Sequence, residues 1–209
     1  MILHIETATK NCSVALAEQG KLIHAIDEYS AQYTHAERLH PLIEQLLQEA
    51  NYKLSDIKAI AVGKGPGSYT GLRIGVSATK GLCFGLKIPL IAIDTLTILS
   101  QPFQNQSVDY IIPMLDARRM EVYTAVFQPN GELTEPIKAL IVEENSFAEY
   151  NGKKVIFAGD GVEKCKHFLT DSSFTLAPEA NPSARDMVTL AYQKFLTNDF
   201  EYVAYLEHF

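Results

Sequence analysis

The sequence predicts an α/β protein made of two similar halves, each with a mixed sheet flanked by helices. Strand patterns alternate with longer helical patterns along the chain, which is typical of parallel crossover connections. Residues 3–16 align with residues 114–127 without a gap, and IAVGKG at 60–65 resembles IFAGDG at 156–161. Because a repeated unit constrains the architecture before local propensity does, we expect the two halves to fold alike.

Hydrophobic periodicity places the elements in order. Apolar residues that alternate with period two predict strands, and apolar residues three or four positions apart predict helices. In the first half we expect strands at 2–6, 12–18, 21–28, 58–63 and 88–93, and helices at 35–50, 70–86 and 95–101. In the second half we expect strands at 109–115, 121–128, 132–142 and 154–159, and helices at 161–169 and 183–197.

A polar stretch, QPFQNQS at 101–107, lies between the two halves. Polar, exposed linkers are typical of boundaries between compact units. We therefore predict an N-terminal lobe at 1–103 and a C-terminal lobe at 104–209.

Composition excludes several classes of function. The chain has 18 Lys and Arg against 25 Asp and Glu, a net charge of −7, which argues against strong binding of nucleic acid by this protein alone. No apolar run approaches the roughly 20 residues that cross a bilayer, and the first residues lack a secretory pattern, so we expect a cytoplasmic protein with no membrane association. Cys12, Cys83 and Cys165 fit neither a disulfide framework nor a zinc knuckle, and we interpret them as buried thiols.

The most distinctive stretch is the glycine-rich segment GKGPGSYTGLRIG at 63–75. It is not a Walker A loop, because Lys64 lies between two glycines and no Lys-Ser/Thr pair opens the following helix. Two interpretations remain open. Either the glycines permit a tight strand-to-helix connection, or the loop and the helix N-terminus bind an anion.

The helix expected at 70–86 has more apolar surface than one core contact uses. Only Arg73, Ser77 and Lys80 form a clear polar stripe, and several small residues would permit close approach of another helix. A second surface therefore packs on this helix, either within the protein or from a partner protein. The helix at 35–50 also carries a broad apolar stripe.

Five segments together resemble the TsaB family, also called YeaZ. They are ILHIETATKNCSVAL at 2–16, THAERLHPLIEQLL at 34–47, the block from IAVGKG to IDTL at 60–96, MLDARRMEVYTAVF at 114–127 and AGDG at 158–161. The resemblance implies the actin-like ATPase fold (ASKHA) of two RNase H-like lobes. It also implies a role in making threonylcarbamoyladenosine next to the anticodon of tRNAs that read codons starting with A.

In that family the protein is a non-catalytic scaffold or activator, not an enzyme, and binds its catalytic paralogue TsaD. The resemblance further implies a TsaE-like ATPase in the larger complex and tRNA contacts mainly through the partner. The surplus apolar surface of the helix at 70–86 predicts a homodimer when the protein is alone. The N-terminal lobe would carry the partner-binding helices. The expected interface residues are Leu39, Leu42, Ile43, Leu46, Gly71, Ile74, Gly75, Ala78 and Leu82.

The catalytic paralogue carries an H-x-x-x-H metal pair where this chain has Thr95 and Leu99. Neither a hydroxyl nor an alkyl group replaces imidazole at a transition-metal site, so we expect no metal and no transferase chemistry. The C-terminal segment at 203–209 also departs from the proline-containing P-x-Y-L ending of the family, which leaves the role of this tail open.

Glu6 and Asp116 end equivalent strands and are weak candidates for cofactor binding. They would bind Mg²⁺ or act as acid and base in a stand-alone ATPase or kinase-like enzyme. Alternatively, they bond the backbone of their own hairpins or Arg118. The turns that follow them contain no glycine for close approach of phosphate, so the structural alternative is favoured and no cofactor is expected.

Overall fold

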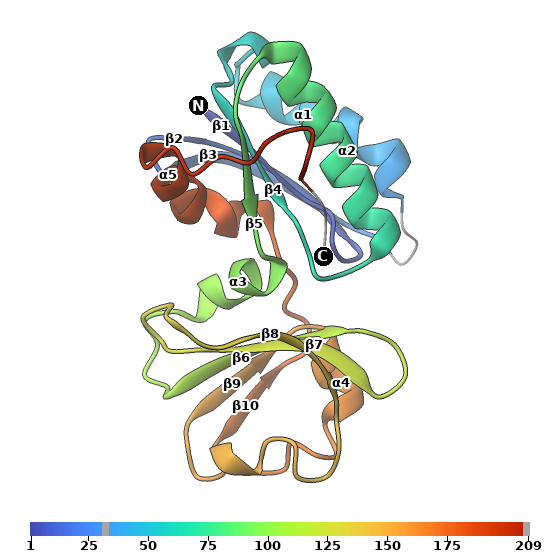
Figure 1. Cartoon of the computed structure of the whole chain (residues 1–209), viewed down its shortest axis with the longest axis vertical. Helices are drawn as coiled ribbons and strands as arrows, with labels where there is room; N and C mark the ends of the chain where they lie inside the picture. The colour runs from blue at the N-terminus through green and yellow to red at the C-terminus, as the bar shows by residue number, and fades with distance from the viewer. Residues whose placement is uncertain (31–33, 207–209) are drawn as a thin grey trace. The chain divides into compact units, whose positions relative to one another are not determined.

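The computed structural model describes residues 1–30 and 34–206. The described residues form two compact units, one within 1–98 and 182–206 and the other at 99–181. Each unit contains one mixed sheet (Figure 1), and each sheet has five strands. Within the described residues, no helix has the length and apolar character needed to span a membrane.

The first sheet has the strand order β3-β2-β1-β4-β5. β1 pairs antiparallel with β2 and parallel with β4, and β4 pairs parallel with β5. The central strands β1 and β4 are buried on both faces, as expected for strands covered by helices. The strands are β1 (Ile2–Glu6), β2 (Asn11–Glu18), β3 (Lys21–Tyr29), β4 (Ala59–Gly63) and β5 (Leu90–Ile93).

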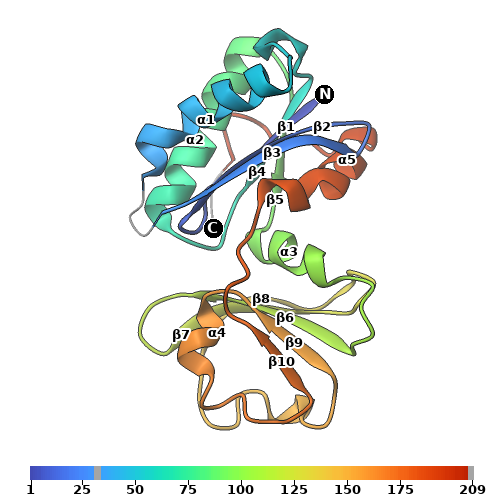
Figure 2. The same ribbon diagram turned by 180° about the vertical axis from the view of Figure 1, so that it is seen from behind.

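Helices cover both faces of this sheet. On one face, Leu3 and Ile5 pack in a cluster with buried residues of α1 (His35–Glu49) and α2 (Tyr69–Leu86). On the other face, Ile2 packs in a cluster with residues of η4 (Ala184–Met187) and α5 (Val188–Leu196). The alternation along β1 follows from the two-residue period of a strand. Figure 2, seen from behind, shows α1 and α2 side by side on the same face of the sheet.

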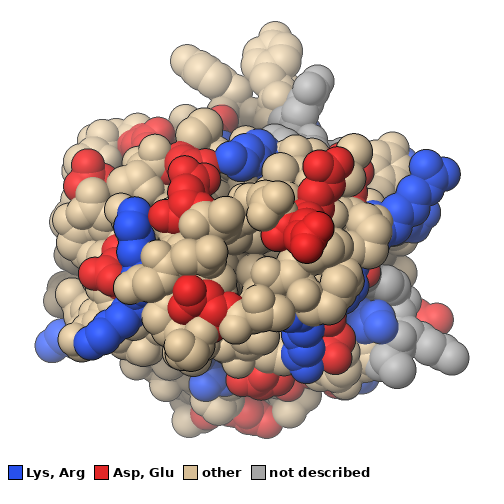
Figure 3. All heavy atoms as spheres, turned by 90° about the horizontal axis from the view of Figure 1, so that it is seen from below, with Lys and Arg blue, Asp and Glu red and all other residues tan. Residues whose placement is uncertain are grey.

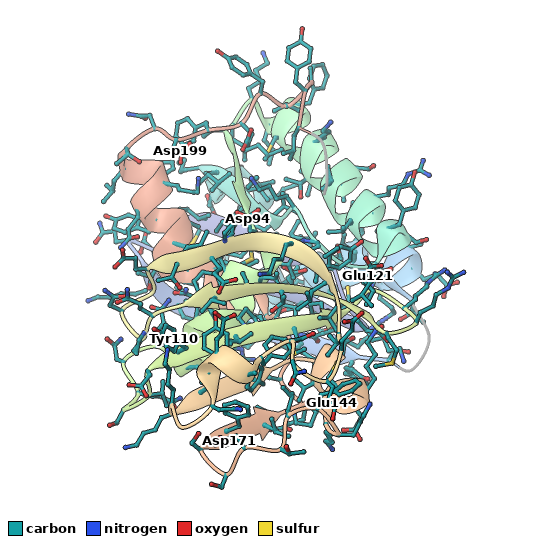
Figure 4. All side chains as sticks on the ribbon, turned by 60° about the horizontal axis from the view of Figure 1, so that its bottom comes forward. Asp94, Tyr110, Glu121, Glu144, Asp171 and Asp199 are labelled. Carbon is teal, nitrogen blue, oxygen red and sulfur yellow. The ribbon has the colours of Figure 1, made fainter. Side chains whose placement is uncertain are left out.

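The second sheet repeats this topology. Its order is β10-β9-β6-β7-β8, which read from the other edge matches the first sheet strand for strand. Its main core combines aliphatic side chains with Phe147, Phe157 and Phe174, which make edge-to-face contacts. Tyr110 of β6, labelled in Figure 4, makes a similar contact with Tyr150. The strands are β6 (Tyr110–Asp116), β7 (Glu121–Phe127), β8 (Leu133–Ile141), β9 (Val155–Ala158) and β10 (Phe174–Ala177).

The predicted duplication and mixed sheets are confirmed, whereas some elements differ. β10 is not among the predicted strands, because a four-residue strand with a single buried position carries almost no periodic signal. The helix expected at 161–169 is the shorter α4 (Gly161–Cys165), and α3 spans Thr95–Ser100. The remaining short helices are η1 (Leu54–Asp56), η2 (Gln101–Phe103) and η3 (Ala148–Tyr150).

The division into units differs from the predicted one at the C-terminus. The boundary at 98/99 lies near the predicted 103/104, but residues from Pro182 onward belong to the first unit. Asn11 donates to the carbonyl of Pro182 (3.1 Å), and the amide of Ala184 donates to Ser13 Oγ (2.8 Å). The predicted lobe 104–209 therefore ends at residue 181, because α5 covers the open face of the first sheet.

All three cysteines are free and buried, as predicted. Burial raises the pKa of Cys12 and of Cys83 to about 12, so both thiols stay protonated at neutral pH.

The glycines of α2 serve two different purposes. A Cβ at Gly71 would clash with the carbonyl oxygen of Thr7, and one at Gly75 would clash with Thr7 Oγ1. By contrast, a Cβ at Gly81 or Gly85 would have no heavy atom of the described residues within 4 Å. The first pair lets the helix approach the β1–β2 connection closely, whereas nothing within the described part of the first unit requires the second pair.

This contrast predicts opposite effects of the same substitution on stability. Gly75→Ala should lower the free energy of unfolding by roughly 1–3 kcal/mol, because the added methyl group overpacks the contact with Thr7. Gly81→Ala should raise it by roughly 0.5–1 kcal/mol, because alanine favours an exposed helix. Urea denaturation of both variants tests this, and equal effects of the two substitutions would contradict the assignment.

Candidate functional site

The two candidate carboxylates, Glu6 and Asp116, make the same local hydrogen bond in the two sheets. Glu6 ends β1, and its Oε1 accepts a hydrogen bond from the amide of Ala8 (2.6 Å). Asp116 ends β6, and its Oδ1 accepts from the amide of Arg118 (2.7 Å). Each carboxylate thus holds the backbone two residues further along, at the start of its hairpin turn. The expected structural alternative is confirmed at both positions.

Glu6 is completely buried. Its Oε2 has no hydrogen-bond partner in the described part of the chain, and a Cβ at Gly63 would clash with it. Desolvation raises the pKa of Glu6 to about 7, although the backbone amides of Ala8 and Thr7 oppose the shift. A carboxyl group this tightly enclosed is a poor ligand for hydrated Mg²⁺, which keeps several of its waters.

Asp116 is exposed but already paired. Its Oδ1 forms an ion pair with Lys164, which also donates to the carbonyl of Glu121. Asp160 Oδ1 accepts from the amide of Asp116 (2.9 Å). The lysine ammonium therefore lies where a cation bound by Asp116 would have to lie. Asp116 and Glu6 also belong to different units.

The glycine-rich loop is a tight connection, which confirms the first of its two interpretations. The amide of Ser68 donates to the carbonyl of Ala8 (2.7 Å), and a Cβ at Gly67 would lie 2.5 Å from the same oxygen. Ser68 caps α2 by accepting from the amide of Gly71 (3.3 Å). Gly65 adopts φ +102°, in the region that glycine reaches without strain. The amides of Ser68 and Gly71 are thus used within the chain.

The positions expected for metal-binding histidines hold buried, non-ligating side chains. Thr95 begins α3, and Leu99 lies one turn further along the same helix. Across residues 1–30 and 34–206, no cluster of three or more His, Cys, Asp or Glu side chains is placed to hold a metal ion.

The structure corrects the predicted partner interface. Six of its nine residues lie in the interior of the first unit, because the apolar stripe of α1 and the first glycines of α2 face the sheet and the β1–β2 connection. These six are Leu39, Leu42, Ile43, Leu46, Gly71 and Gly75. Ile74, Ala78 and Leu82 are partly exposed and remain available to a partner.

An exposed surface remains on the two helices, which we call the helix-pair face. Phe84, which belongs to this face, has 82% of its surface exposed, although it is a large apolar side chain. A shallow cavity of about 310 Å³ lies beside Thr70, Arg73, Ile74 and Ser77. The helix-pair face comprises Ala36 of α1 with Ile74, Ala78, Gly81, Leu82, Phe84 and Gly85 of α2.

The sequence also carries a pattern for this face at positions outside the nine predicted interface residues. Gly81 and Gly85 repeat the four-residue spacing of Gly71 and Gly75, and the large apolar Phe84 lies beside them. Periodicity identified a helix with two apolar sides but did not say which side faced the sheet. The contact of α2 with Thr7 decides this, and it is a tertiary contact.

Charged side chains of both signs are interspersed on the face seen in Figure 3. That face shows no continuous area of Lys and Arg, in keeping with the net charge of −7. Nucleic acid would find no extended positive surface on this side.

Comparisons with known proteins give a consistent result. The family model described as TsaD, tRNA N6-adenosine threonylcarbamoyltransferase, matches residues 29–203. The tRNA threonylcarbamoyladenosine biosynthesis protein TsaB of Haemophilus influenzae is 40% identical over 93% of this chain and 86% of its own. The protein of the same name from Escherichia coli is 32% identical over 93% and 87%.

Solved structures agree with these sequence matches. YeaZ from Pseudomonas aeruginosa superposes with a TM-score of 0.85 at 30% identity, covering 100% of this chain and 98% of that one. The ethanolamine utilization protein EutJ from Carboxydothermus hydrogenoformans has a TM-score of 0.57 at 9% identity, over 91% of this chain and 89% of that one. The second likeness concerns the fold alone, and it supports the predicted actin-like fold.

The burial of Glu6 predicts a specific dependence of stability on pH. The folded state holds the Glu6 proton with a pKa of about 7, against about 4.5 when unfolded, so the carboxyl favours folding most below about pH 4.5. As pH rises towards and through about 7, this contribution is lost, by roughly 3 kcal/mol in all. Glu6→Gln should remove this loss of stability with rising pH.

Urea denaturation between pH 5 and pH 8 measures the effect as a difference between the variant and the wild type, which cancels other titrating groups. Glu44→Gln, at an exposed position of α1, is the matched control and should keep the wild-type slope. An identical slope in Glu6→Gln and wild type would contradict the assigned role of Glu6.

Proposed function

The chain belongs to the TsaB family, and we propose that it serves tRNA threonylcarbamoyladenosine biosynthesis as a non-catalytic subunit that binds a TsaD-type catalytic protein. The names of the TsaB relatives support the pathway. The observation that carries the binding role is the helix-pair face, where a large apolar side chain and two helical glycines are exposed together.

The composition of the helix-pair face supports a helical partner. Each exposed glycine costs a helix up to roughly 1 kcal/mol relative to alanine, and neither Gly81 nor Gly85 is needed by a contact within the described chain. A partner helix packing closely against α2 would use both. Clustered apolar side chains on a protein surface commonly mark such contacts. We propose that the face also joins two copies of this chain when the partner is absent.

The state of the candidate carboxylates supports a non-catalytic role. Glu6 is enclosed, and Asp116 is neutralised by Lys164. In the proposed complex the partner supplies the transfer chemistry and most contacts with tRNA, since this chain is acidic overall. Family resemblance adds a TsaE-like ATPase to that complex, and work on tRNA would place it in the cytoplasm.

A stand-alone ATPase or kinase-like enzyme is the second candidate function. The actin-like fold favours it, since Glu6 and Asp116 end equivalent strands of the two sheets. Their engagement with backbone amides and with Lys164 weighs against it.

The proposed binding role predicts that charge and bulk at Gly81 block association with the TsaD-type protein of the same cell. Gly81→Glu places a carboxylate at the centre of the helix-pair face, where desolvation without a partner would cost several kcal/mol. We expect the variant to fold but to bind the TsaD-type protein with at least tenfold lower affinity. In size-exclusion chromatography the two proteins should then elute separately. Cells carrying it should lose the tRNA modification.

Two further variants make this experiment decisive. Ala78→Glu lies on the same face but partly contacts the core, so it should lose binding and some stability. Gln193→Glu on α5, an exposed position on the other side of the sheet, should bind as wild type does. Normal binding by folded Gly81→Glu would refute the proposed interface.

Activity of the isolated chain separates the two candidate functions. We expect no ATP turnover above background, because Glu6 is inaccessible and Asp116 is paired with Lys164. The measurement is phosphate release by the purified protein with Mg²⁺ and ATP. Turnover that Asp116→Ala abolishes would overturn the non-catalytic role.

A further inference from the structure

The two helices that form the helix-pair face carry opposite charges. α1 exposes Glu37 and Glu44, whereas α2 has no acidic residue over its whole length from Tyr69 to Leu86. The charges of α2 are Arg73, which is exposed, and Lys80, which is half-buried. Such a basic helix is unusual in a chain whose net charge is −7.

Helix geometry places these charges on opposite margins of the face. Gly71 marks the side of α2 that is turned to α1, because a Cβ there would lie 3.2 Å from the ring of His35. At about 100° per residue, Arg73 and Lys80 both lie about 180–200° from Gly71, on the side away from α1.

The acidic margin lies on α1. The side chain of Arg38 is turned to β3 by its bidentate ion pair with Glu28, through Nε at 2.7 Å and Nη2 at 2.6 Å. Glu37 and Glu44 lie about 100–120° around α1 from Arg38, on the outer surface.

These four charges are not used within the first unit. No ion pair among the described residues involves Glu37, Glu44, Arg73 or Lys80, whereas the other α1 charges, Arg38 and Glu49, are paired with β3. Arg73 lies over the ring of Tyr69, 5.4 Å from its centre, and Glu44 accepts from Gln48 at 3.3 Å. Both contacts leave the charge itself uncompensated.

We propose that the helix-pair face selects a partner surface of the opposite polarity, apolar in the middle, basic where it meets α1 and acidic where it meets α2. This inference rests on the proposed function, since it names the chemistry of the TsaD-type surface that docks there. The arrangement fixes the orientation of docking, because turning the partner around would bring like charges together. A polyanion such as RNA is disfavoured, because Glu37 and Glu44 repel it.

Charge reversal on each helix tests this inference. Arg73→Glu with Lys80→Glu makes both margins acidic, and Glu37→Lys with Glu44→Lys makes both basic. Each double variant should bind the TsaD-type protein about tenfold more weakly at low salt. The loss should shrink between about 0.05 M and about 0.5 M salt, because screening shortens the range of the interaction.

The fourfold variant separates polarity from net charge. Combining both reversals restores the wild-type net charge but inverts the polarity of the face. If polarity governs docking, the fourfold variant binds most weakly of all. If it binds as wild type does, only net charge matters and the inference is overturned.

Controls distinguish this inference from the proposed function. Lys21→Glu with Lys58→Glu changes net charge as much as the α2 reversal does, at exposed sites outside both helices, and should leave binding within twofold of wild type. Unfolding midpoints confirm that each variant folds. Absence of binding by the wild type would refute the proposed function. Tight binding that is unchanged by every charge reversal and by salt would refute only the inferred polarity of the partner surface.

Discussion

The close packing of α2 against the β1–β2 connection sets the orientation of this helix in the first unit. Thr7 Oγ1 donates to the carbonyl of Gly71 (2.8 Å), and the glycines at 67, 71 and 75 leave room for the backbone and side chains of Thr7 and Ala8. This contact fixes the rotation of α2 about its axis. The same rotation turns Phe84, Gly81 and Gly85 outward, so the packing of one side creates the exposed surface on the other.

The same connection explains the state of Glu6. Its carboxyl is enclosed beside Gly63 and holds the amide of Ala8, whose carbonyl in turn accepts from Ser68 at the start of α2. Glu6 therefore supports the start of α2 through the backbone of Ala8. In the second unit Asp116 has a parallel role, with Lys164 neutralising its charge. The helix-pair face, by contrast, has no counterpart there, since η3 is three residues long and α4 is five.

Much of the architecture could be predicted because it follows from short-range patterns of apolar residues in the sequence. The repeat between residues 3–16 and 114–127 predicted two sheets of one topology, and alternating apolar residues placed nine of the ten strands. β10 was missed, since four residues between turns leave no pattern to detect. The return of residues 182–206 to the first unit was missed as well. It depends on bonds between Asn11 or Ser13 and a segment some 170 positions away, which no local pattern encodes.

Local sequence patterns were enough to predict the fold class, the duplicated halves and two helices with surplus apolar surface. They also showed that Thr95 and Leu99 stand where the catalytic paralogue has histidines. Which side of each helix faces the core and which side is exposed became known from the folded chain. Leu39 and Gly75 belong to the core, whereas Phe84 and Gly81 belong to the surface. The physical reason is that periodicity defines the stripes on a helix but not its rotation, which is set by contacts such as that of Gly75 with Thr7.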